Sequence, residues 1–175
     1  DYLLSKYFTQ SVDGFLAMSQ SVYDDINSFD AKKPKALTPH PIYDNYGPIV
    51  GRSKSLEHLN LDSESRYLLF FGFIRDYKGL DILLEAVADE RIKSMPVKLI
   101  VAGEFYGNGD KYMALINKYG LKNSVILHNK FISNEDVKYY FGASDLVAQP
   151  YKTATQSGIS QLAYHFEKPM LVTNV

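Results

Sequence analysis

The sequence predicts an α/β fold built on a doubly wound parallel sheet with helices on both of its faces. From Tyr67 onward, apolar runs of strand length alternate with segments in which apolar residues recur at helical spacing. Strands separated by helices favour a parallel sheet, because each crossover helix returns the chain to the same end of the sheet. The run at 68–71 is short and apolar throughout, which is typical of a strand covered on both faces.

Five strands are predicted, and glycine or proline stands beside most of them. They are residues 68–71, 97–102, 125–127, 146–148 and 170–172. Gly72 follows the first strand and Gly103 the second, while Pro150 and Pro169 stand next to the last two. These residues interrupt regular structure, so they fix where each strand stops or starts.

Four helices are predicted between and after the first four strands. Helical spacing of apolar residues places them at 80–88, at 112–119, after Ser133 and at 159–166. Gly120 is in position to end the second helix. Ser133 and Asp136 form a capping box that opens the third, because the serine side chain accepts the free N–H at the third helical position while Asp136 reaches back.

The first 66 residues are less regular than the rest. We expect a helix at 2–10, a strand at 14–18, and a helix at 21–29 that opens with Ser21. Three prolines follow between residues 38 and 48, which excludes a helix there and indicates a linker.

The linker divides the chain into two parts. Residues 1–50 are interpreted as the end of a neighbouring domain with its linker, and residues 51–175 as the α/β domain. We expect the chain to be cut from a longer one at Asp1, which is no initiator methionine, and at Val175, which ends an apolar run.

The composition excludes several classes of function. The 175 residues are 46% hydrophobic, and 19 Lys+Arg against 20 Asp+Glu leave a net charge of −1. Without a basic block, no binding of nucleic acid is expected. The absence of cysteine excludes disulfides, cysteine-bound zinc and thiol catalysis. No apolar run approaches the roughly 20 residues that span a bilayer, so no transmembrane segment is expected, whereas peripheral membrane association stays open.

The loop after the first predicted strand has the residues of an anion site. It runs from Gly72 to Gly79 and carries Arg75 and Lys78 just before a helix N-terminus. Glycine allows close approach to a ligand, and helix N–H groups and cations attract negative charge. The loop is no Walker A sequence, and the chain has no G-x-G-x-x-G. An ordinary solvated turn is the alternative interpretation.

A second anion-ready loop precedes the last predicted helix. It carries Thr155, Gln156, Ser157 and Gly158. Hydroxyl, amide and backbone N–H groups at a helix start bind phosphate oxygens. The alternative is simple capping of the helix by Ser157 or Thr155. Both loops follow strands of one parallel sheet, so we expect them at the same edge.

Several motifs of the sequence resemble those of a known enzyme family. Residues 67–175 resemble the C-terminal, donor-binding domain of the family 4 glycosyltransferases, which have the GT-B fold. The matching motifs are FFGFIRDYKGLDILLEA at 70–86, LIVAGE at 99–104, ASDLVAQPY at 143–151 and KP at 168–169. Residues 11–45 resemble the segment that closes the N-terminal domain of these enzymes. The resemblance implies a Rossmann-like half of a GT-B enzyme with the end of its acceptor domain.

The activity that the resemblance implies is sugar transfer with retention of anomeric configuration. The substrate would be a UDP-, GDP- or other nucleoside diphosphate sugar, with no cofactor and no bound metal. The acceptor would be a glycan or a lipid-linked glycan in polysaccharide biosynthesis, in the cytoplasm at the inner face of the membrane. Because the acceptor domain is almost wholly missing, we expect this fragment to bind donor without turning over alone.

The resemblance also implies roles for individual residues. Arg75 and Lys78 match the basic pair that neutralises the donor diphosphate, although the commonest version has arginine where this chain has Phe73. His128 and the residues up to Ile132 would flank the base, with a plain surface histidine as the alternative. The residues implied in nucleotide binding are Gly72, Gly103, Glu104, Phe131 and Ile132.

The chain departs from the family pattern at two glutamates. Ala154 and Leu162 stand at their positions, and Glu167 replaces a glycine. Contacts to sugar and phosphate are therefore assigned to the polar run Thr155, Gln156, Ser157 and Gly158. The departure keeps two other functions open: a non-catalytic nucleotide-sugar-binding or interaction module, and a sugar-nucleotide epimerase of the same architecture.

Overall fold

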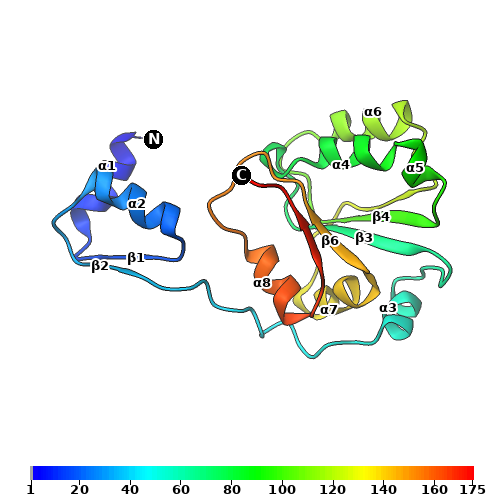
Figure 1. Cartoon of the computed structure of the whole chain (residues 1–175), viewed down its shortest axis with the longest axis horizontal. Helices are drawn as coiled ribbons and strands as arrows, with labels where there is room; N and C mark the ends of the chain where they lie inside the picture. Colours follow the sequence, from blue (N-terminus) through cyan, green and yellow to red (C-terminus); the bar gives the residue numbers. More distant parts are fainter. Residues whose placement is uncertain (1) are drawn as a thin grey trace. The chain divides into compact units, whose positions relative to one another are not determined.

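The computed structural model describes residues 2–175 (Figure 1). The chain forms two compact units. The first reaches to Pro41 and takes in Thr155–Ser157, and the second comprises Ile42–Ala154 and Gly158–Val175. The linker from Ile42 onward thus groups with the α/β unit. The identification of the two parts as acceptor and donor domain stays a prediction.

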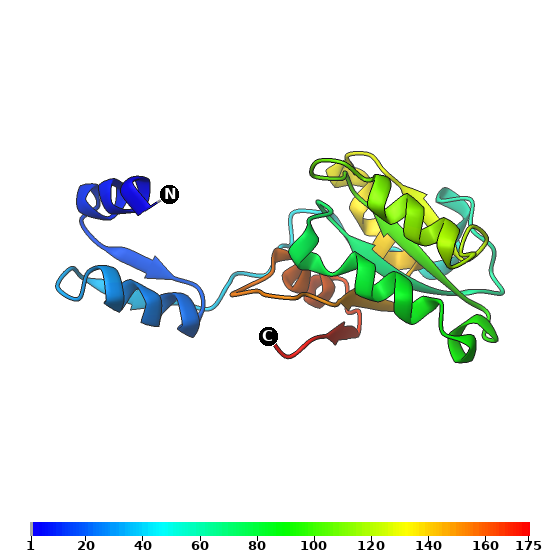
Figure 2. The same cartoon turned by 90° about the horizontal axis from the view of Figure 1, so that it is seen from above.

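The first unit pairs two short parallel strands with two helices. Its elements are α1 (Tyr2–Ser11), β1 (Phe15–Ala17), α2 (Gln20–Phe29) and β2 (Lys35–Leu37). Figure 2 shows β1 between α1 and α2 in that view. Strand β2 was not predicted, because its three residues carry no apolar alternation. The predicted cap of α2 was wrong by two residues: Ser19, rather than Ser21, accepts the N–H of Val22 at 3.3 Å.

The second unit contains the predicted five-stranded parallel sheet. Its strands are β3 (Arg66–Phe71), β4 (Val97–Ala102), β5 (Val125–His128), β6 (Leu146–Gln149) and β7 (Met170–Val172). Their spatial order is β5-β4-β3-β6-β7, and every pair is parallel. The chain reverses its direction of winding at β3, so the sheet is doubly wound as predicted.

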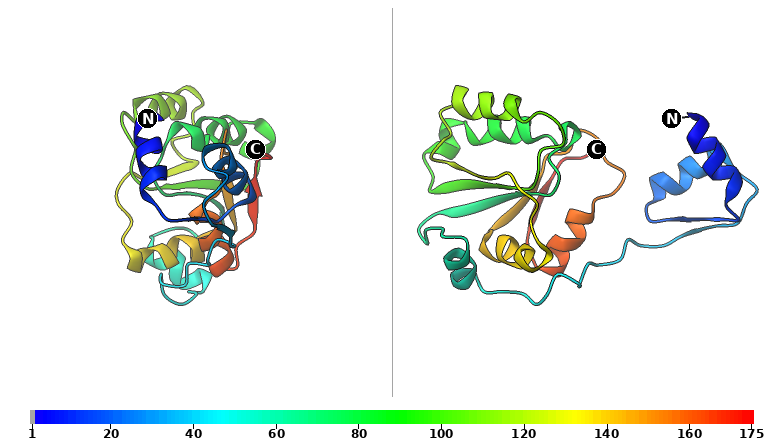
Figure 3. Two further views of the ribbon diagram at one scale, coloured as in Figure 1. Left: turned by 90° about the vertical axis from the view of Figure 1, so that its left-hand side faces the viewer. Right: turned by 180° about the vertical axis from the view of Figure 1, so that it is seen from behind.

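Helices cover both faces of this sheet. The layer on one face contains α4 (Leu80–Val87), α5 (Glu90–Lys93) and α6 (Asp110–Lys118), and the layer on the other contains α7 (Asn134–Ala143) and α8 (Gly158–His165). The view from behind in Figure 3 shows the same two layers. The capping box before α7 is present in part, since the Ser133 hydroxyl accepts the Asp136 N–H at 3.2 Å.

Two helices of this unit, α3 (Arg52–His58) and the four-residue α5, were not predicted. Helix α3 packs against α7 and buries Leu56. Its seven residues include a single apolar side chain, so periodicity could not detect it.

The core lies in two layers that follow the alternation of the strands. Leu69 and Ile100 are buried on the face covered by α7 and α8, whereas Phe70, Leu99 and Val101 are buried on the face covered by α4 and α6. Successive strand residues point to opposite faces, so an apolar run fills both layers. This explains why the strands read as continuous apolar runs.

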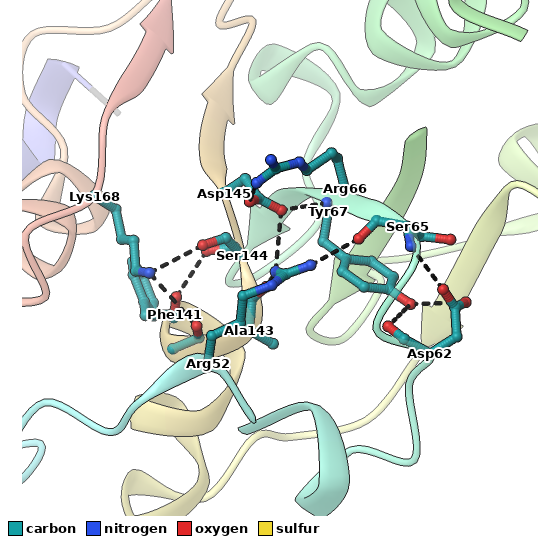
Figure 4. A network of polar contacts seen from close by, with 11 residues as sticks. Arg52, Asp62, Ser65, Arg66, Tyr67, Phe141, Ala143, Ser144, Asp145 and Lys168 are labelled. Atoms are coloured by element: carbon teal, nitrogen blue, oxygen red, sulfur yellow. Dashed lines mark hydrogen bonds and ion pairs between the residues drawn. The ribbon is translucent and has the colours of Figure 1, made fainter. Parts of the chain in front are cut away.

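A network of hydrogen bonds and ion pairs joins the amino ends of β3 and β6 to each other (Figure 4). The Asp145 carboxylate accepts the Tyr67 N–H at 2.8 Å and pairs with Arg52 at 3.1 Å and Arg66 at 2.8 Å. Arg52 also donates to the carbonyl of Ala143 at the end of α7 and to that of Ser65. Partial burial acts to raise the pKa of Asp145, but these donors hold it below its usual value. The network therefore joins α3, α7 and two strands.

We expect Asp145→Ala to lower the free energy of unfolding by about 2–4 kcal/mol, because it leaves several partly buried donors unpaired. The folded-state pKa of Asp145 lies below its unfolded value, so this stabilisation is present above about pH 4 and is lost as pH falls through the folded pKa. Urea unfolding followed by circular dichroism at pH 7 and pH 3 measures both effects. The exposed Glu57→Ala on α3 is the control, and equal losses for both variants at pH 7 would contradict the role of the network.

Candidate functional site

The carboxyl ends of the five strands lie along one edge of the sheet, where α/β proteins bind their ligands. Gly72 follows β3 and Gly103 follows β4, with φ of 90° and 140°. A Cβ atom on Gly103 would lie 2.2 Å from the Gly72 carbonyl oxygen. The two strand ends therefore meet at a distance that only glycine permits, and Gly72 donates its N–H to the Ala102 carbonyl at 2.9 Å.

A cavity of about 230 Å³ opens at this edge. Six residues predicted from the sequence line it together: Gly72, Gly103, Glu104, Phe131, Ile132 and Gly158. Most other lining side chains are apolar, and Phe73 and Phe131 are 52% and 67% exposed. Exposed rings beside an apolar cavity suit a flat ligand that stacks on them.

Two lining residues come from the linker and were missed by the sequence analysis. Tyr43 and Tyr46 line the cavity and pack against the core under α7 and α8. Atom Nε2 of His165 lies 2.9 Å from the Gly47 carbonyl, which holds the linker at this place. Two aromatic residues in an otherwise polar, proline-containing passage were the available signal.

The β3–α4 loop carries the predicted basic pair, but its two members differ. A single 3-10 turn (Asp76–Lys78) precedes Gly79, and Lys78 is only 8% exposed. Its Nζ atom lies 3.2 Å from the point where a Cβ on Gly72 would stand. Burial, with the Arg75 charge nearby, lowers the pKa of Lys78 to about 8. Arg75 is exposed, and its guanidinium lies 4.4 Å from the ring centre of Tyr106.

Within residues 2–175, neither Arg75 nor Lys78 forms an ion pair with a carboxylate. An unpaired cation is ordinary for the exposed Arg75. It is unusual for the buried Lys78, because buried charges are costly unless they are paired. Lys78 is therefore the group at this edge that most lacks an anionic partner.

The β6–α8 loop is joined directly to the β3–α4 loop. A Cβ on Gly79 would lie 1.9 Å from the Pro150 carbonyl oxygen. The Lys152 N–H donates to the Tyr77 carbonyl at 2.7 Å, and the Lys152 ammonium pairs with Asp81 at 2.7 Å and Asp76 at 3.2 Å. The two loops that the sequence analysis singled out thus meet, as their place in a parallel sheet predicts.

The polar run before α8 divides between the two units. Gly158 begins α8 and lines the cavity. Thr155, Gln156 and Ser157 group with the first unit, and their position relative to the cavity is not determined. Their assignment to sugar and phosphate stays a prediction.

His128 is a packed residue of β5 and does not line the cavity. Its Nδ1 atom lies 2.7 Å from the Tyr140 hydroxyl. Burial, followed by the charge of Lys130, lowers the pKa of His128, and burial raises the pKa of Tyr140 to about 12. Both shifts favour the neutral forms of the pair, and a role for His128 beside a base stays a prediction.

Neither a metal-binding cluster nor a membrane-spanning helix is found among the described residues. Residues 2–175 contain no group of three or more histidine, cysteine or acidic side chains placed to hold a metal ion. None of the helices described has both the length and the apolar character needed to cross a bilayer.

Comparison with known proteins points to one family. A family model described as "Glycosyl transferases group 1" matches residues 51–175. D-inositol 3-phosphate glycosyltransferase from Segniliparus rotundus is 35% identical over 95 residues, which are 53% of this chain and 21% of that protein. This chain thus spans about a fifth of the length of that relative.

Solved structures of glycosyltransferases share the fold. WaaG, a glycosyltransferase involved in lipopolysaccharide biosynthesis, matches with a TM-score of 0.76 and 21% identity over 90% of this chain and 43% of its own. HepE from Anabaena, in complex with UDP and glucose, matches with a TM-score of 0.72 and 21% identity over 91% and 44%. Sucrose-phosphate synthase from Thermosynechococcus elongatus gives 0.79 and 16% over 97% and 43%. The fold of this chain is thus that of GT-B glycosyltransferases.

We expect Gly79→Ala to destabilise the second unit more than Gly120→Ala, by at least about 2 kcal/mol. Both glycines have a left-handed backbone, with φ of 71° and 67°, so the cost of that conformation is shared. A Cβ on Gly120 meets nothing within 4 Å, whereas one on Gly79 meets the Pro150 carbonyl. Urea unfolding of the two variants measures the difference, and equal stabilities would disprove the tight contact between the loops.

Proposed function

The chain belongs to the glycosyl transferases of group 1, and on this premise we propose that its second unit binds the diphosphate of a nucleoside diphosphate sugar at the carboxyl edge of the sheet. The observation that carries the proposal is the buried, unpaired ammonium of Lys78 beside Gly72. A phosphate oxygen supplies the negative charge that no carboxylate of residues 2–175 provides for Lys78.

The cavity next to Lys78 supports a nucleotide as the bound group. Gly72, beside which the Lys78 ammonium lies, also lines the cavity. Phe73 and Phe131 offer ring faces to a base, and Glu104 offers a carboxylate to ribose hydroxyls. HepE, which shares the fold, was solved in complex with UDP-glucose. We therefore place the base and ribose in the cavity and the diphosphate at Lys78.

The proposed reaction is sugar transfer with retention of configuration, as in the family 4 enzymes. The bond between the anomeric carbon and the diphosphate oxygen breaks while a bond to an acceptor hydroxyl oxygen forms, and the hydroxyl proton passes to the departing diphosphate. Negative charge grows on the departing diphosphate. Lys78, with Arg75 from the same loop, stabilises that charge, and a preorganised cation in a partly buried site does so more strongly than water.

The acceptor belongs to the proposal for the whole protein. We propose a glycan or lipid-linked acceptor in polysaccharide biosynthesis, in the cytoplasm at the inner face of the membrane, and the description of WaaG fits this class. The acceptor would bind a larger N-terminal domain, so the present chain binds donor without turnover.

A non-catalytic nucleotide-sugar-binding module is the second candidate. The observation in its favour is that Ala154 and Leu162 stand where the family pattern has glutamates. Leu162 lines the cavity, and Glu104 is the one carboxylate among the lining residues described. Sugar transfer to acceptor by the full-length protein separates the two candidates.

We expect the chain to bind at least one of UDP, GDP and ADP saturably in calorimetry, and Lys78→Met to weaken that binding by tenfold or more. The same variant should raise the free energy of unfolding at pH 7 by roughly 1–3 kcal/mol, because it removes a buried unpaired charge. The exposed Lys122→Met is the matched control for both measurements. A loss of stability with unchanged affinity would make Lys78 structural and sink the proposal.

The affinity for the diphosphate should depend on pH through Lys78. Its pKa in the free protein is about 8, and a bound anion raises it, so binding favours the protonated lysine. Affinity is therefore expected to stay level between pH 7 and 8 and to fall as pH rises above 8, with protons taken up on binding. Calorimetry in two buffers of different ionisation enthalpy measures the uptake. A fall of the same size in Lys78→Met would assign the pH dependence to another group.

A further inference from the structure

A second buried hydrogen-bond donor without an acceptor lies at the end of β6. Gln149 is 4% exposed, and its Oε1 atom accepts the Ser160 hydroxyl of α8 at 3.0 Å. Its Nε2 atom is buried and has no acceptor in the part of the chain that the structure describes. A buried amide N–H without a partner costs about 1–3 kcal/mol, so native proteins rarely leave one without a reason.

Gln149 and Lys78 belong to the same corner of the sheet edge. Gln149 precedes Pro150, whose carbonyl touches Gly79, and Gly79 follows Lys78. From the other side, Ile159 and the Lys78 ammonium both lie 3.2 Å from the position of a Cβ on Gly72. Ile159 in turn precedes Ser160, the residue that holds the Gln149 side chain. Both routes place the Gln149 and Lys78 residues at the same corner of the sheet edge.

The two groups lack the same kind of partner. An amide N–H and an ammonium both donate hydrogen bonds, so each needs an acceptor atom. A buried water would satisfy the amide but would leave the lysine charge uncompensated. An anionic oxygen satisfies both, and hydrogen bonds to charged oxygens are about twice as strong as neutral ones.

We propose that Gln149 is a ligand-binding residue whose Nε2 atom donates, together with Lys78, to a non-bridging oxygen of the bound diphosphate. The inference rests on the proposed function and adds a neutral donor to its anion site. Gly72 and Ile159 line the cavity, and the Lys78 ammonium and Ile159 both lie near the point where a Cβ on Gly72 would stand. In this proposal the phosphate oxygen approaches the two donors from the cavity.

The experiment compares Gln149→Leu, which keeps the volume and removes the donor, with Gln161→Leu on α8 as the matched control. The probes are UDP, GDP, ADP, inorganic pyrophosphate and uridine, titrated in a calorimeter against the 175-residue chain. We expect Gln149→Leu to weaken the nucleoside diphosphate and pyrophosphate by the same factor, about tenfold, and to leave uridine unchanged. Its midpoint of urea unfolding should stay about the same, because loss of the orphaned amide offsets loss of the acceptor for the Ser160 hydroxyl.

A second variant keeps the inference falsifiable where Gln149→Leu packs poorly. Gln149→Glu places a carboxylate beside Lys78, which should abolish pyrophosphate binding while the chain stays folded by circular dichroism. Unchanged affinities in Gln149→Leu, with Lys78→Met still weakened, would overturn the role of Gln149 and leave the proposed function standing. Absence of diphosphate and pyrophosphate binding by the unmodified chain would overturn both.

Discussion

The site at the carboxyl edge of the sheet depends on one close contact, that of Gly79 with the Pro150 carbonyl oxygen. No residue with a side chain fits there, and the left-handed backbone of Gly79 turns the chain into α4 at the same point. Lys78 directly precedes Gly79, and Gln149 directly precedes Pro150. The contact between Gly79 and Pro150 therefore holds the backbones of the two donor residues near each other. The exposed ion pairs of Lys152 with Asp76 and Asp81 reinforce this contact.

The two ends of the sheet differ in whether their buried charges are paired. At the amino end, Asp145 and Arg52 satisfy each other and the carbonyls around them, so their charges contribute to stability. At the carboxyl end, Lys78 is buried beside Gly72 with no carboxylate within reach among the residues described. Among the described residues, the fold thus pairs its buried charges at one end of the sheet and leaves that of Lys78 unpaired at the other, which lowers stability at the candidate site. That asymmetry locates the site more firmly than the size of the cavity does.

Sequence patterns predicted the parallel sheet and its two helical layers because a strand covered on both faces carries apolar side chains on both, as β3 does over 67–71 and β4 over 99–102. They missed α3, whose one apolar side chain is Leu56, α5, which is four residues long, and β2, which is three residues long. In the candidate site, Gly72 and Lys78 were predicted as binding residues because glycines and cations stand beside the strand ends. Gln149 could not be predicted, because a glutamine at the end of a strand gives no sign in the sequence that α8 buries it. Tyr43 was missed for the same reason, since only the folded linker brings it to the cavity.

The absence of the two family glutamates bears on how a donor would be selected. Leu162 is buried in the wall of the cavity at one of these positions, so the wall offers packing there instead of hydrogen bonds to sugar hydroxyls. Under the proposed function, binding free energy then comes from the diphosphate, through Lys78 and Gln149, and from the base, through aromatic rings. Such contacts are common to all sugars carried on one nucleotide. On this proposal, discrimination between sugars comes from polar groups outside the lining of this cavity, and the cavity itself recognises the nucleotide part of the donor.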